Sequence, residues 1–88
     1  MAEVTVYIRS WCPYCHRALA LLSAKGVECR MIDVEREPGA YLVMLQRAAG
    51  RRTVPQIFIG EYHVGGNDDL QDLDATGRLD PLLAATTS

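Results

Sequence analysis

The feature that most constrains the fold of this chain is the order in which strand-like and helix-like patterns follow one another. Apolar residues alternate with polar ones in residues 3–8, which predicts a strand, and residues 27–34 predict a second one. Between them, residues 13–25 carry apolar side chains at helical spacing, and Pro13 suits the first helical position. Because strand–helix–strand units pair in parallel with right-handed crossovers, this half of the chain predicts a parallel pair of strands.

The second half of the chain predicts a further helix, an antiparallel hairpin and two more helices. Pro38 opens the first of these helices and Gly50 ends it. A strand at 57–59, a tight turn at Gly60-Glu61 and a strand at 62–64 form the hairpin. Asn67 caps the next helix, which Gly77 ends, and Asp80-Pro81 caps a short last helix. The complete order predicts an α/β fold, with a small mixed sheet flanked by helices.

Length, composition and charge exclude several classes of protein. A chain of 88 residues with 49% hydrophobic residues predicts a single domain, spanning residues 1–88, that can bury a core. A formal net charge of −2 argues against a nucleic-acid-binding protein, which is normally basic. No secretory signal is visible, and the longest strongly apolar run, 18–22, is too short to span a membrane. We therefore expect a cytoplasmic protein without a membrane partner.

Two cysteines, Cys12 and Cys15, lie three residues apart in the segment "SWCPYCHRA", a spacing used by metal sites, structural disulfides and redox pairs. A tetrahedral zinc site needs four ligands, whereas this chain adds only Cys29 and two histidines, His16 and His63. In a reducing cytoplasm, a close pair is more often catalytic or metal-binding than a structural disulfide. Redox use is the favoured interpretation, and an iron–sulfur cluster bridged between two chains stays open.

The predicted position of Cys12, between a strand and a helix, makes it the candidate nucleophile. Its sulfur is expected beside the backbone N–H groups of the first helical turn, where the helix dipole stabilises a negative charge. Cysteines in such places have pKa values of about 3.5–7.5, and the thiolate is the attacking species. Cys15 lies one turn later on the same face, so we expect it to be deeper, less ionised and second to act.

Four segments of the chain resemble the signatures of the glutaredoxin family. They are "CPYC" at 12–15, "TVPQIFI" at 53–59, "GGNDDL" at 65–70 and "LDPLLA" at 79–84, in the family's order and across nearly the whole chain. The resemblance implies a thioredoxin-like fold, in which helices cover both faces of a four-stranded mixed sheet. It also implies a glutathione-disulfide oxidoreductase, which reduces protein–glutathione mixed disulfides and some protein disulfides.

The resemblance further implies which molecules this protein meets. Glutathione is the expected co-substrate, regenerated by a reductase that uses NADPH, and no tightly bound cofactor or metal is expected. Glutathionylated or disulfide-containing proteins are the expected partners, with ribonucleotide reductase a candidate because some family members serve it. We expect a monomer. Two alternatives share the fold: a redoxin coupled to thioredoxin reductase, and a glutathione-ligated [2Fe-2S] cluster carrier.

The resemblance places a glutathione site on the two later motifs. The bond between Val54 and Pro55 is expected to be cis, which leaves the Val54 backbone to pair with the cysteine residue of glutathione. Gly66 leads into a helix start at Asn67 and Asp68, where backbone N–H groups suit the γ-glutamyl carboxylate. Asp68 is expected to hold the neighbouring ammonium group or, in the simpler interpretation, to cap the helix.

Further contacts with glutathione are expected from side chains around these motifs. Arg9 lies where relatives often carry lysine and is expected to favour the Cys12 thiolate and meet the glycyl carboxylate, a task that Arg51 or Arg52 could share. Tyr14 either flanks the sulfur or contributes its ring to the core. Thr53 either contacts the ligand or is an ordinary residue at a strand end.

Two positions depart from the family pattern, and one cysteine lies outside it. Asn67 stands where close relatives often have cysteine, so regulation by a thiol at that position is not expected. Trp11 stands where threonine or a small residue is more usual, and its ring either packs on a substrate or has no role. Cys29 alternates with apolar neighbours, which favours a buried thiol that behaves as a small apolar side chain.

Overall fold

A four-stranded mixed sheet lies at the centre of the molecule, with the strand order β2-β1-β3-β4. The computed structural model describes residues 3–84. Strand β1 (Val4–Ile8) pairs in parallel with β2 (Cys29–Asp33) and antiparallel with β3 (Gln56–Ile59), which in turn pairs antiparallel with β4 (Tyr62–Gly65). The predicted α/β class, the parallel pair and the closing hairpin are confirmed.

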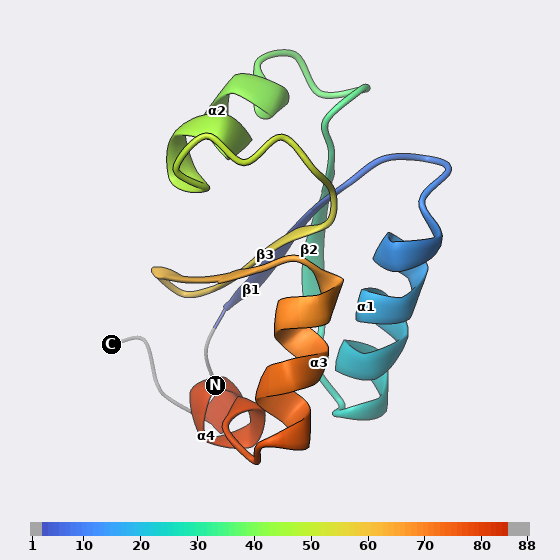
Figure 1. The fold of residues 1–88 in the computed structure, drawn as a ribbon. Coiled ribbons are helices and arrows are strands. Elements are labelled where there is room, and N and C mark those ends of the chain that lie inside the picture. The colour runs from blue at the N-terminus through green and yellow to red at the C-terminus, as the bar shows by residue number, and fades with distance from the viewer. Residues whose placement is uncertain (1–2, 85–88) are drawn as a thin grey trace.

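Within residues 3–84, four helices cover the two faces of this sheet. Helices α1 (Pro13–Ala24), α3 (Asn67–Ala75) and α4 (Leu79–Ala84) lie on one side of it, and α2 (Ala40–Arg47) lies on the other (Figure 1). No helix within residues 3–84 is both long enough and apolar enough to cross a membrane.

Each face of the sheet has its own hydrophobic core. Successive side chains of a strand point to opposite faces, so Val4 and Val6 of β1 enter one core and Tyr7 enters the other. The core under α1, α3 and α4 contains Val4, Val6, Ala18, Leu22, Val27, Ile57, Ile59, Val64, Leu70, Leu73, Leu79 and Leu83. The core under α2 contains Tyr7, Ile32, Val34, Ala40, Met44, Ala48 and Phe58. Residues 57–59 serve both cores, which explains why three apolar residues follow one another there.

Two helices begin at other residues than the sequence predicted. Helix α2 starts at Ala40 rather than at Pro38, because Gly39 adopts the left-handed conformation at the cap position, with φ of 77°. Helix α3 starts at Asn67, with Gly66 as its N-cap, so the prediction that Asn67 caps the helix was wrong by one residue. The carboxylate of Asp69, from within the helix, accepts a hydrogen bond from the Gly66 N–H and closes the cap.

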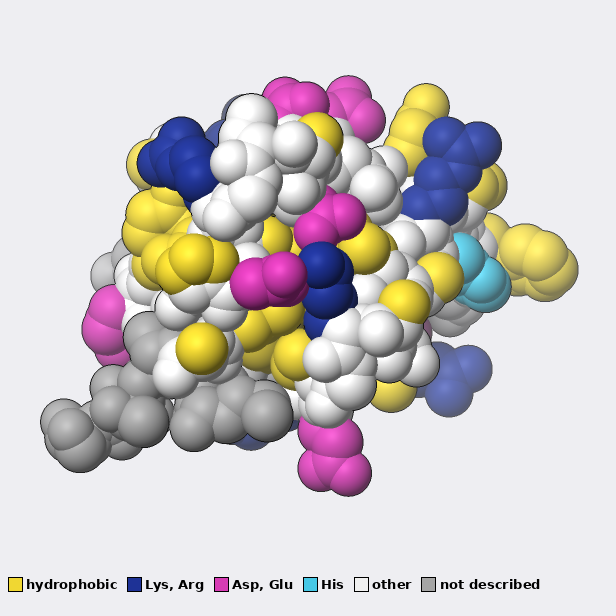
Figure 2. Space-filling model, turned by 90° about the horizontal axis from the view of Figure 1, so that it is seen from below, with side chains coloured by type: hydrophobic (Ala, Val, Ile, Leu, Met, Phe, Trp, Pro, Cys, Tyr) yellow, Lys and Arg dark blue, Asp and Glu magenta, His cyan; other side chains and the backbone are white. Residues whose placement is uncertain are grey.

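The start of the last helix was also predicted two residues late, since α4 begins at Leu79, whereas an Asp80 cap would start it at Pro81. Leu79 is fully buried, and its packing sets the start of the helix. Asp80 instead pairs with Lys25 Nζ at 2.8 Å, and the same ammonium group lies 2.7 Å from Asp74. These pairs join the end of α1 to α3 and α4. Seen from below, the surface of the molecule shows acidic, basic and apolar side chains interspersed (Figure 2).

Candidate active site

Cys12 lies where the sequence placed it, between β1 and α1. It is the N-cap residue of α1, with extended backbone angles, and its Sγ accepts a hydrogen bond from the Cys15 N–H at 3.2 Å. Pro13, at the first helical position, has no N–H, so the Cys15 N–H is the donor that reaches the sulfur. The Cys12 sulfur therefore lies at the start of the helix, against a backbone N–H donor.

Cys15 lies deeper than Cys12, as predicted. Only 1% of its surface is exposed, against 8% for Cys12. Burial raises the pKa of the Cys15 thiol, and a hydrogen bond with Cys12 raises it further. Both residues are free cysteines in this structure. The pair therefore combines a less buried position at the helix start, held by Cys12, with a deeper thiol of raised pKa, held by Cys15.

The loop before β3 brings a carbonyl group to the cysteine pair. The peptide bond between Val54 and Pro55 is cis, as the resemblance implied. The Val54 carbonyl oxygen lies 3.6 Å from Cys12 Sγ and accepts a hydrogen bond from it when the sulfur is a thiol. Segments 42 residues apart in the sequence thus meet at the reactive sulfur.

Beside this contact lies a cleft of about 220 Å³. Its lining residues are Tyr14, Arg51, Thr53, Val54, Pro55, Gly66, Asn67, Asp68 and Asp69. The structure therefore brings every residue predicted to contact glutathione into one cleft, with the exceptions of Arg9 and Arg52. Cys12 is not itself a lining residue, but its sulfur lies against Val54, which is.

The Arg9 side chain lies away from the cleft, whereas Tyr14 borders it, which agrees with one of its two predicted places. The Arg9 guanidinium lies over the ring of Tyr41, 5.8 Å from its centroid, on the side of the molecule that α2 occupies. Tyr14 is 54% exposed, so its ring lines the cleft and does not contribute to the core. The Arg17 guanidinium lies 5.6 Å from the centroid of that ring.

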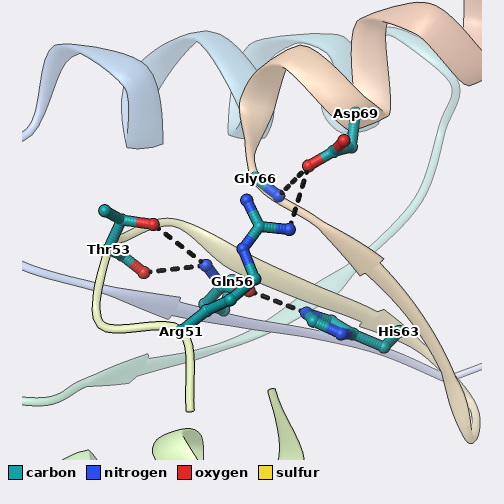
Figure 3. A network of polar contacts seen from close by, with 6 residues as sticks. All are labelled: Arg51, Thr53, Gln56, His63, Gly66 and Asp69. Carbon is teal, nitrogen blue, oxygen red and sulfur yellow. Dashed lines mark hydrogen bonds and ion pairs between the residues drawn. The ribbon is translucent and has the colours of Figure 1, made fainter. Parts of the chain in front are cut away.

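An acidic residue that the sequence analysis overlooked, Asp69, closes the start of α3. Its Oδ2 accepts hydrogen bonds from the Gly66 N–H at 2.8 Å and from Arg51 Nη1 at 3.2 Å (Figure 3). The bond from Gly66, followed by the Arg51 guanidinium, lowers the pKa of Asp69 below its ordinary value. A carboxylate three residues after a helix cap is a known capping signal, and the sequence Gly66-Asn67-Asp68-Asp69 contained it.

The same contacts distinguish between the candidate anion-binding groups. Because Asp69 takes the Gly66 N–H, the next N–H groups of the helix start belong to Asn67 and Asp68. The side chain of Asn67 is buried and accepts a hydrogen bond from Gln71 Nε2 at 3.2 Å.

Of the two arginines that the sequence left open, Arg51 lines the cleft and Arg52 does not.

A second cavity, of about 670 Å³, lies on the opposite side of the sheet near the start of α2. Its lining includes Tyr7, Arg30, Glu37 and Arg47 and contains no cysteine. Although it is the larger of the two, it holds no nucleophile and lies across the sheet from the sulfurs. The smaller cleft, which adjoins the cysteine pair, is therefore the candidate active site.

The structure places the third cysteine, Cys29, on β2. Cys29 is half-buried on β2 and packs against the core, and burial raises the pKa of its thiol, which agrees with a packing role although it is less buried than predicted. Residues 3–84 contain no group of three or more His, Cys, Asp or Glu side chains that could hold a metal ion.

The family model described as glutaredoxin matches residues 4–64, which include the cysteine pair, the cis-proline loop and the hairpin. The chain belongs to the glutaredoxin family. Glutaredoxins are glutathione-dependent thiol oxidoreductases, and that is the activity of this protein.

Comparisons with individual glutaredoxins extend over almost the whole chain. Glutaredoxin 3 of Escherichia coli strain K12 is 53% identical over 83 residues, which cover 94% of this chain and 99% of that protein. The solution structure of a Brucella melitensis glutaredoxin has 52% identity and a TM-score of 0.81, with 94% of this chain and 89% of that one covered. A buckwheat glutaredoxin–glutathione complex has 32% identity and a TM-score of 0.84, with 93% and 76% covered. These similarities confirm the predicted thioredoxin-like fold.

Proposed function

We propose that Cys12 is the nucleophile with which this glutaredoxin reduces protein–glutathione mixed disulfides, and that Cys15 is the resolving thiol for protein disulfides. The observation that supports these roles is the asymmetry of the pair. The Cys12 sulfur accepts an N–H hydrogen bond at the helix start, whereas burial raises the pKa of Cys15. Because the thiolate is the reactive form, the first attack falls to Cys12.

Reduction of a glutathionylated protein then takes two exchange steps. The Cys12 thiolate attacks the glutathione sulfur, a Cys12–glutathione disulfide forms, and the protein sulfur leaves as a thiolate that takes up a proton. A second glutathione thiolate attacks the glutathione sulfur of that disulfide. Oxidised glutathione leaves, and the Cys12 thiolate is restored for the next cycle.

Protein disulfides require both cysteines. Cys12 first forms a mixed disulfide with the protein, and Cys15 then loses its proton and attacks the Cys12 sulfur. The protein leaves reduced, and the Cys12–Cys15 disulfide is reduced in turn by two glutathione molecules. The raised pKa of Cys15 keeps it protonated while Cys12 makes the first attack.

In this proposal, glutathione lies along the cleft as an extended tripeptide and is a co-substrate, not a tightly bound cofactor. Its cysteine residue pairs with the Val54 backbone, next to the Cys12 sulfur. Its γ-glutamyl carboxylate meets the N–H groups at the start of α3, and Asp68 faces the ammonium group. Arg51 lines the cleft and pairs with Asp69 at the start of α3, so in this placement it lies beside the γ-glutamyl carboxylate.

The polypeptide part of a glutathionylated substrate has to lie outside this cleft, over its rim. Trp11 directly precedes Cys12 and is 96% exposed, so its ring is available to pack on that polypeptide. We place the enzyme in the cytoplasm, because reduced glutathione is maintained in that compartment. We also propose that it acts as a monomer. Ribonucleotide reductase is one candidate substrate of the proposed dithiol reaction.

The test is reduction of a glutathionylated peptide, coupled through glutathione and its reductase to NADPH oxidation. Cys15→Ser should keep most of the activity, because glutathione resolves the intermediate, and Cys12→Ser should lose it. Cys29→Ser is the matched control and should behave as wild type. An active Cys12→Ser variant, or an inactive Cys15→Ser variant that still folds, would contradict the proposed roles.

A further inference from the structure

A fully buried amide, the side chain of Gln56, links the active-site loop to the hairpin strand β4. Its Nε2 donates to the Thr53 carbonyl oxygen at 3.0 Å and to Thr53 Oγ1 at 3.2 Å, and its Oε1 lies 2.7 Å from His63 Nε2 (Figure 3). Neither Gln56 nor His63 lines the cleft. Their contacts therefore act on the cleft only through Thr53, which does line it.

The direction of these hydrogen bonds places a hydrogen on Nε2 of the histidine. A carbonyl oxygen can only accept, so the amide nitrogen of Gln56 has to face Thr53, and its oxygen has to face His63. His63 Nε2 therefore carries a hydrogen. Burial, followed by the Arg51 charge, lowers the pKa of His63, so the ring is neutral near neutral pH and is the Nε2–H tautomer.

The imidazole ring that supplies this donor is itself held in place. It stacks on Phe58, with the ring centroids 4.8 Å apart and the planes at 19°. Phe58 is also in contact with the Arg47 guanidinium, 4.1 Å from its centroid, and forms a T-shaped pair with the ring of Tyr7. The donor is thus built on the rigid core under α2.

We infer that Gln56 and His63 are positioning residues for glutathione, which hold the Thr53–Val54 backbone at the depth where it faces the Cys12 sulfur. Gln56 fixes Thr53, and the next carbonyl along the chain is the one that lies 3.6 Å from Cys12 Sγ. A displaced Thr53–Val54 backbone would weaken the binding of glutathione in the ground state and in the transition state alike, because Val54 pairs with it in both. The inference rests on the proposed placement of glutathione against Val54.

The decisive variant is His63→Phe, which keeps an aromatic ring on Phe58 and removes the Nε2–H donor. We expect KM for the glutathionylated peptide to rise about fivefold with little change in kcat, since a lost binding geometry affects ground state and transition state alike. His63→Gln, whose amide nitrogen can take the place of Nε2, should restore most of the loss. Thr76→Ala is the control, because it removes a hydrogen bond at the far end of α3, where Thr76 Oγ1 donates to the Asp72 carbonyl.

Nitrogen-15 NMR supplies readouts that do not depend on turnover. The His63 ring should show the Nε2–H tautomer, and His63→Phe should shift the amide signals of Thr53 and Val54 more than those of α4. A Nδ1–H tautomer, wild-type kinetics in His63→Phe, or an equal loss in His63→Phe and His63→Gln would overturn the inference. An active Cys12→Ser variant would instead overturn the proposed function and leave the NMR outcome as the test of the positioning.

Discussion

Removal of the Asp69 carboxylate is the most informative single perturbation of this protein, because one group closes the start of α3 and holds Arg51 in the cleft. Asp69→Ala removes the acceptor of the Gly66 N–H at 2.8 Å and of Arg51 at 3.2 Å. Asp69→Asn removes the charge but leaves an oxygen that can accept. A comparison of the two separates the capping hydrogen bond from the electrostatic part.

The expected loss can be built up from these contacts. A hydrogen bond to a charged group contributes about 1.5–3 kcal/mol, and the lower value applies because 47% of the Asp69 side chain is exposed. The ion pair with a similarly exposed Arg51 contributes about 0–1 kcal/mol, and the helix dipole about 0.3–1 kcal/mol. Since all three share one carboxylate, we expect Asp69→Ala to lower the free energy of unfolding by about 2 kcal/mol. For a domain of this size, that lowers Tm by about 8–16 °C.

The sign of the pH dependence follows from the direction of the pKa shift. The folded protein lowers the pKa of Asp69 below its ordinary value of 3.8, so the folded state binds fewer protons than the unfolded state around that pH. The stabilisation is therefore complete above about pH 5 and is lost as the pH falls through 3.8 and the folded-state pKa. The difference between wild type and Asp69→Ala should shrink over the same range.

The assay is urea unfolding at neutral pH and near pH 3, followed by circular dichroism, because Trp11 is 96% exposed and its fluorescence reports little on the core. The Arg51→Ala variant and the Arg51→Ala/Asp69→Ala double variant complete a cycle that measures the pair itself. A loss below about 0.5 kcal/mol, in the range of ordinary surface substitutions, or a loss that is unchanged at acid pH, would refute the reasoning.

Three further outcomes test other parts of the site. Gly65→Ala should destabilise the protein by about 1–3 kcal/mol, because φ is 109° and a Cβ would collide with the side chains that close the start of α3. Gly77→Ala is the control in thermal unfolding, since a Cβ there would meet open space. Equal losses in the two variants would contradict the collision. Trp11→Ala should lower kcat/KM about fivefold for a glutathionylated protein and leave a small glutathione disulfide unaffected, whereas an equal effect on both would argue against a polypeptide contact. Iodoacetamide near neutral pH should label Cys12 and spare Cys15, since burial raises the pKa of Cys15, and mass spectrometry can locate the label. Equal labelling of the two cysteines in the folded protein would contradict the raised pKa of Cys15.

The order and type of the elements were predictable from residue patterns, whereas some of the helix starts were not. Alternation in 3–8 and helical spacing in 13–25 depend on local side-chain periodicity, which survives in the folded protein. The starts of α3 and α4 depend on contacts with other residues. Gly66 caps α3 because Asp69 reaches back to it, and α4 begins where Leu79 enters the core.

The candidate site divides in the same way. The cysteine pair and the motifs at 53–59 and 65–70 were visible in the sequence, and the structure gathers them beside one cleft. The position of Arg9 over Tyr41 and the exposure of the Tyr14 ring were not visible, because side-chain direction depends on what packs next to a helix or strand end.

By itself, the sequence determined the α/β order, the reactive pair at a helix start and the resemblance to glutaredoxins, since each resides in a short run of neighbouring residues. Only the tertiary structure decided which residues surround the sulfur, because Val54 approaches Cys12 across 42 positions and through the pairing of β1 with β3. It also decided that Arg51 rather than Arg52 borders the cleft, and that Gln56 and His63 stand behind Thr53. Such contacts depend on the register of the sheet and on burial, which neighbouring residues in a sequence do not encode.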